Sequence, residues 1–90
     1  MIVNKEMLNA VLDAALTTAR SYRGKSNELY ALGQLEATAN LIYITICCQD
    51  KRDFGHLEIR CQASAQEAVD RMERIMHDKT ARSGSSAQFG

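Results

Sequence analysis

Hydrophobic residues in the N-terminal segment recur with the period of one helical face. Apolar side chains return every three or four residues at Leu8, Val11, Leu12, Ala15, Leu16, Ala19 and Tyr22. Asn4 is a suitable N-cap, and Gly24 can adopt the left-handed conformation that often ends a helix. The pattern therefore predicts an amphipathic helix from about Asn4 to Tyr22.

A longer apolar stripe follows in the second segment. Ser26 or Asn27 can cap a helix there, and Glu28 would lie in its first turn, where the helix dipole favours an acid. The stripe then runs in alternating steps of three and four through Leu32, Leu35, Ala39, Ile42 and Ile46. This heptad spacing predicts a second helix.

Two interpretations of residues 41–62 remain open. The β-branched run after Leu41, and the alternation of apolar with polar residues at 57–62, favour a β-hairpin and an α+β fold. The helical interpretation instead places Asp53 as an N-cap and aligns one face through Phe54, Leu57, Cys61, Ala65, Ala68, Met72 and Ile75. The continuous heptad and the absence of proline favour the helical version. We therefore expect an all-α bundle of two to three helices, with a helix over 64–77 in either case.

The C-terminal residues lack a hydrophobic period. Residues 80–90 hold three serines, two glycines and one charged residue. Such a composition is typical of disorder. The sequence thus predicts one helical domain over residues 1–79 and a disordered tail over residues 80–90.

Apolar residues surround more of the second helix than one core-facing stripe requires. A chain of 90 residues buries only about 60–65% of its surface, so it cannot cover such a helix on all sides. Self-association would supply the missing cover; the alternative is that this helix is the central member of a monomeric bundle. We expect a homo-oligomer, a dimer or tetramer, whose interface contains Leu32, Leu35, Ala39, Ile42 and Ile46.

The charge balance and the candidate chemistry argue against several classes of function. Eleven basic residues match eleven acidic ones, and zero net charge disfavours direct binding to nucleic acid or to an anionic membrane. Cys47, Cys48 and Cys61 lack the short paired spacing of zinc ligands. No nucleophile or acid–base motif stands out. We therefore expect a cytoplasmic protein with reduced thiols, no enzymatic activity, no metal and no cofactor.

Two charged stretches are candidates for binding a partner protein. Acidic and basic residues alternate from Glu67 to Arg74, and mixed-sign faces suit specific protein contacts. A basic cluster lies at the predicted end of the first helix. The candidate partner-binding residues are Arg20, Arg23, Lys25, Arg71 and Arg74.

The segment Leu29–Cys48, LYALGQLEATANLIYITICC, together with the short length and zero net charge, resembles the small helical accessory proteins of temperate phages and prophages, of the antirepressor type. This resemblance implies a regulator or inhibitor that binds a transcriptional repressor directly in the host cytoplasm and removes it from its operator. It brings no catalytic or cofactor residues with it. The alternative function is a structural or assembly subunit whose main partner is itself.

Overall fold

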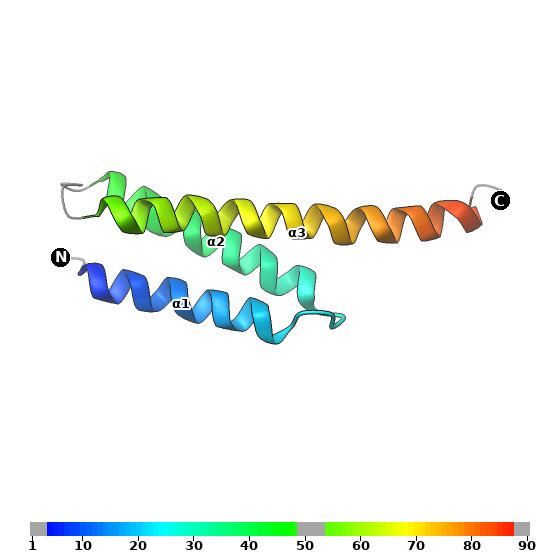
Figure 1. The fold of residues 1–90 in the computed structure, drawn as a ribbon, viewed down its shortest axis with the longest axis horizontal. Coiled ribbons are helices and arrows are strands. Elements are labelled where there is room, and N and C mark those ends of the chain that lie inside the picture. The colour runs from blue at the N-terminus through cyan, green and yellow to red at the C-terminus, as the bar shows by residue number, and fades with distance from the viewer. Residues whose placement is uncertain (1–3, 49–53, 88–90) are drawn as a thin grey trace.

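The residues that the structure describes fold as three helices in an up–down–up arrangement (Figure 1). The computed structural model describes residues 4–48 and 54–87, with side chains described up to residue 78. Helix α1 spans Lys5–Ser21, α2 spans Glu28–Cys47 and α3 spans Gly55–Ala87. Helix α2 packs extensively on both neighbours, whereas α1 and α3 contact each other much less. The central position of α2 explains why its sequence is the most apolar of the three.

The predicted helical bundle is confirmed, and the alternative hairpin at 41–62 is wrong. Within residues 4–48 and 54–87 there is no strand, and α2 continues to Cys47. The β-branched side chains Ile42 and Ile46 are buried against the other helices. Their burial outweighs the weak intrinsic preference of such residues for strands. The predicted N-cap Asp53 lies outside the described residues.

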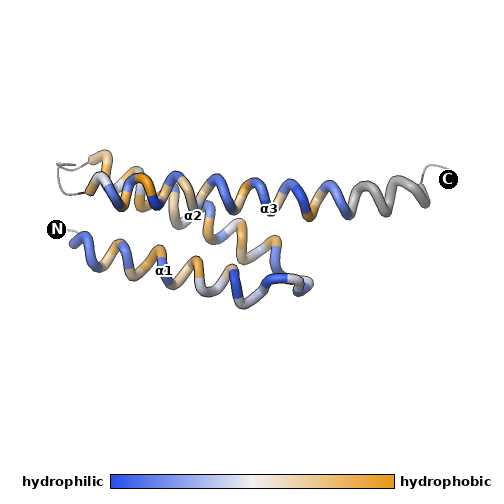
Figure 2. The backbone as a smooth tube through the Cα atoms, in the orientation of Figure 1, coloured by the Kyte–Doolittle hydropathy of each residue, from blue (hydrophilic) through white to orange (hydrophobic). Residues whose placement is uncertain are grey.

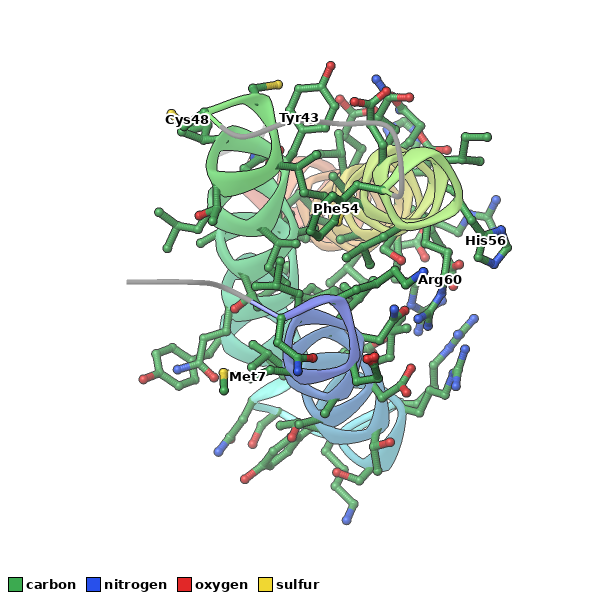
Figure 3. All side chains as sticks on the ribbon, turned by 90° about the vertical axis from the view of Figure 1, so that its left-hand side faces the viewer. Met7, Tyr43, Cys48, Phe54, His56 and Arg60 are labelled. Atoms are coloured by element: carbon green, nitrogen blue, oxygen red, sulfur yellow. The ribbon has the colours of Figure 1, made fainter. Side chains whose placement is uncertain are left out.

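The core follows the predicted stripes on all three helices. It consists of Leu8, Leu12, Leu16, Ala19, Leu32, Leu35, Ala39, Ile42, Ile46, Leu57, Cys61 and Ala68. Phe54, just before α3, points into the interior between the helices (Figure 3). Figure 2 shows hydrophobic and hydrophilic residues alternating along α1 and α3, as expected for helices with one buried face.

Helix α3 is longer than the sequence predicted. It continues through Ala87, whereas the predicted domain ended at residue 79 and the predicted tail began at Thr80. Its C-terminal part extends past the other two helices (Figure 1). Adding residues to an existing helix avoids the cost of nucleating a new one, so the loss of apolar periodicity marked the end of the bundle rather than the end of the helix. Residues 88–90 lie outside the described residues.

The ends of α1 match the capping signals. The side chain of Asn4 accepts a hydrogen bond from the amide of Met7 at 3.1 Å. The C-cap of α1 is Tyr22, and Gly24, two residues later, has a φ of +79°, the left-handed conformation expected of it, although it lies one residue beyond the C′ position predicted for it. The loop from α1 to α2 therefore depends on a glycine at this position.

Two glycine substitutions should change stability in opposite directions. Gly24→Ala should lower the free energy of unfolding by about 1 kcal/mol, because a Cβ strains the left-handed backbone even though it meets no atom within 4 Å. Gly33→Ala, inside α2 and equally uncrowded, should raise that free energy by about 0.5–1 kcal/mol. Urea unfolding measures both. Equal effects of the same sign would contradict the assigned backbone conformation of Gly24.

Candidate functional site

A groove opens between the C-terminal half of α1 and the middle of α3, with α2 as its floor. It encloses about 430 Å³. The floor is apolar and is formed by Leu16, Ala19, Leu32, Leu35 and Ala68. Four arginines also line it: Arg20, Arg23, Arg71 and Arg74. We call this feature the arginine groove.

A buried ion pair forms part of the lining of the arginine groove. Glu28, only 4% exposed, accepts two hydrogen bonds from Arg71, with Nε to Oε2 at 2.8 Å and Nη2 to Oε1 at 3.0 Å. The amide of Gly24 donates a third hydrogen bond to Oε1 at 3.0 Å. Arg23 lies farther away, with its Nε 3.9 Å from Oε2. This two-pronged geometry ties α3 and the α1–α2 loop to the first turn of α2.

The ion pair shifts the protonation equilibria of both partners. The hydrogen bonds from Arg71 lower the pKa of Glu28, and this effect exceeds the opposing effect of burial. The amide of Gly24 lowers it further. The same contact raises the pKa of Arg71. Glu28 is therefore ionised at neutral pH, as a carboxylate paired with a guanidinium should be.

A second link joins α1 to α3 near the other end of the bundle. Arg60 donates hydrogen bonds to Asn9 and to Asp13, the latter at 2.7 Å. Figure 3 shows Arg60 on the side of α3 that faces α1. Since α1 and α3 contact each other little elsewhere, the arginine groove lies open between this link and the ion pair.

The structure brings together four of the five predicted partner-binding residues. Arg20, Arg23, Arg71 and Arg74 all line the arginine groove, although they come from two distant parts of the sequence. Lys25 is exposed and does not line it. Arg71 is less available than the sequence suggested, because its side chain is only 25% exposed and is held by Glu28. The exposed arginines are Arg20, Arg23 and Arg74.

The residues predicted to form an oligomer interface lie instead in the core of the single chain. Leu32, Leu35, Ala39, Ile42 and Ile46 are each at most 5% exposed. Helices α1 and α3 cover them, because α2 is the central helix and its heptad stripe points toward both neighbours. In this fold, a second copy can reach only the opposite side of α2.

The cysteines have structural surroundings that differ from one another. Cys61 is buried, and burial raises the pKa of its thiol, so it packs as a neutral apolar group. Cys47 and Cys48 are exposed at the end of α2. Among the described residues, no three acidic, histidine or cysteine side chains come close enough to hold a metal ion.

Helix length and hydropathy also bear on membrane insertion. In the described part of the chain, no helix is both long enough and apolar enough to span a bilayer.

Sequence reasoning missed the role of Glu28. It was interpreted only as a first-turn acid, yet it lies four residues before Leu32 and so continues the heptad stripe toward the core. A carboxylate on a buried stripe needs a cationic partner, and this is the signal that could have identified it. The identity of that partner, Arg71 in α3, required the tertiary structure.

Comparison with known proteins gives no assignment. No protein-family model, curated protein or solved structure matches this chain.

Proposed function

We propose that this protein is a non-enzymatic regulator that binds a segment of another protein in the arginine groove. The observation that carries this proposal is the combination of an apolar floor with exposed arginines along one opening. Grooves of this kind accept an amphipathic helix, whose apolar side chains contact the floor while its polar side chains meet the rim.

The charges around the groove define the partner segment. The α1 side is basic, because Arg20 and Arg23 stand there and the acid nearest Arg23, Glu28 at 3.9 Å, is buried and already paired with Arg71. The α3 side is mixed, with Glu67 and Asp70 next to Arg74. A helix with carboxylates on one flank and mixed charges on the other complements this arrangement. Glu28 is not available to the partner, because it is buried against Arg71.

The finer identity proposed for the protein is a phage or prophage antirepressor. In this role, the segment bound in the arginine groove belongs to a transcriptional repressor, and binding removes the repressor from its operator in the host cytoplasm. The balanced charge of the chain supports a protein target over DNA, since non-specific DNA affinity comes mainly from unmatched lysines and arginines.

Reversing the charge of the basic side should weaken partner binding. The double variant Arg20→Glu with Arg23→Glu places two acids opposite the carboxylates of the partner segment, and we expect the affinity to fall by about tenfold or more. The partner is first captured from the source cells by the wild-type protein and identified by mass spectrometry. Its dissociation constant is then measured with purified proteins by calorimetry.

A matched control separates the groove from general surface charge. Lys25→Glu changes an exposed base in the same loop that does not line the groove, and it should leave the affinity unchanged. Equal losses for Lys25→Glu and for the double variant would contradict the proposed site. Tight binding of the wild-type protein to random duplex DNA at physiological salt would contradict the proposed class of function.

A further inference from the structure

The side of α1 and α2 that faces away from α3 is apolar and exposed. Tyr30, Leu41 and Ile44 of α2 are 71%, 64% and 57% exposed. Met7 and Val11 of α1 are 59% and 45% exposed. Figure 3 shows Met7 on the α2 side of α1, away from Arg60. With Ala37, which lies between Tyr30 and Ile44 on α2, these residues form what we call the outer face.

The outer face carries both a ridge and a groove. Tyr30, Leu41 and Ile44 recur on α2 with the spacing of one helical face and form the ridge. Beside it, a shallow groove of about 340 Å³ runs between α1 and α2. Small residues make up most of its lining, among them Ala15, Thr18, Ala31 and Ala37. A surface with a ridge next to a groove of small residues can pack on a copy of itself about a two-fold axis.

The outer face has no charged group that would oppose this contact. Between residues 29 and 48 the only charged residue is Glu36, which lines the groove between α2 and α3 on another side of the helix. On α1, the exposed Met7 and Val11 and the groove-lining Ala15 and Thr18 are uncharged as well. Two copies can therefore meet here without burying an unpaired charge.

The area of the outer face is sufficient for a stable dimer. With 20 residues in α2, the face is about 30 Å long, and two neighbouring helices make it about 20 Å wide. The molecule is about that wide, with shorter extents of 21 and 19 Å. Contact over such a face buries about 600 Å² on each copy, or about 1,200 Å² in total, which reaches the range of specific interfaces.

We propose that the outer face is the surface through which two copies of this chain form a homodimer. The ridge of each copy occupies the groove between α1 and α2 of the other, so the contact is reciprocal. The oligomer expected from the sequence then uses the side of α2 opposite its heptad stripe. This proposal does not depend on the arginine groove, which opens on the other side of α1 and stays accessible in each copy.

The first test is the mass of the protein in solution. The wild-type chain should have twice the 10.0 kDa of one copy when measured by light scattering during size exclusion. The double variant Leu41→Glu with Ile44→Glu should have the mass of one copy and keep its helical circular dichroism, because both residues are exposed in the folded chain. Ile59→Glu, at an equally exposed isoleucine on α3, should remain dimeric.

A cross-link keeps the test decisive if the double variant fails to fold. We place the two-fold axis of the proposed dimer near Ala37, which lies midway between Tyr30 and Ile44 and also lines the groove. In a background with Cys47→Ser and Cys48→Ser, Ala37→Cys should form a disulfide-linked dimer under mild oxidation. Ala63→Cys, exposed in the arginine groove, should not.

A wild-type monomer at concentrations up to about 100 µM would overturn the proposal. So would a dimer that persists in the double variant, or cross-linking of the Ala63→Cys variant without that of Ala37→Cys.

Discussion

Ile42→Asp should strongly destabilise this protein. Ile42 is 4% exposed and packs in the core between the helices. The substitution removes buried apolar contacts and places an unpaired carboxylate among apolar groups, which together should lower the free energy of unfolding by about 4–5 kcal/mol. A small domain has only about 5–15 kcal/mol to lose. The midpoint of thermal unfolding, followed by circular dichroism, should fall by about 20 °C or more.

A surface isoleucine provides the comparison for this result. Ile59 is 65% exposed in the first turns of α3, so Ile59→Asp should shift the thermal midpoint by no more than a few degrees. The pair also distinguishes a core position from an interface position. If Ile42→Asp kept the thermal midpoint and only reduced the mass in solution, Ile42 would belong to an oligomer interface and its placement in the core would be wrong.

Glu28→Gln should destabilise the protein by about 2 kcal/mol at neutral pH. The amide keeps the shape of the side chain but removes the charge that holds Arg71 in a two-pronged contact. Hydrogen bonds to charged groups contribute about 1.5–3 kcal/mol, and Glu28 is well shielded from water at 4% exposure. Urea unfolding measures the difference from the wild-type protein. Glu36→Gln, a change of the same kind farther along α2, should cost much less.

The effect of Glu28 should also depend on pH, with a defined sign. Its pKa in the folded protein is lowered from the ordinary value of about 4.5. Its contribution to stability is therefore fully present above that ordinary value, and it is lost as the pH falls through the lowered pKa. The difference between the wild-type protein and Glu28→Gln should be constant from neutral pH down to about 4.5 and should shrink below it. A difference that grows in acid would contradict the ion pair with Arg71.

Hydrophobic spacing predicted the helices because it reports directly on which side of a helix is buried. The apolar stripe of α1 is followed by the left-handed Gly24 in the loop, and the apolar stripe of α2 reaches Ile46 as predicted. The face predicted for α3 has its core positions at Leu57, Cys61 and Ala68. Hydrophobic spacing does not indicate where a helix ends once the helix extends beyond its neighbours. Residues 80–87 are helical without such a period, as a continuation of a helix already formed by the packed part of α3.

The arginines of the candidate site were identified from the sequence, but their arrangement was not. Arg20 and Arg23 come from the end of α1 and its loop, and Arg74 comes from α3, so only the packing of the helices makes them line one groove. The sequence also could not separate Arg71 from its neighbours. Its partner Glu28 is distant in the chain, and the contact exists only because α3 crosses the first turn of α2.

The sequence by itself determined the buried faces of the helices before residue 41 and after residue 63, because those faces repeat with the helical period, but it left a hairpin open over residues 41–62. Tertiary structure decided what covers each face. The heptad stripe of α2 could equally have met a second chain, but α1 and α3 of the same chain cover it, which leaves the outer face with Leu41 and Ile44 exposed. A periodic hydrophobic pattern indicates that one face of a helix is buried. The pattern does not indicate which chain covers that face, because the hydrophobic effect depends on the apolar area buried and not on the chain that buries it.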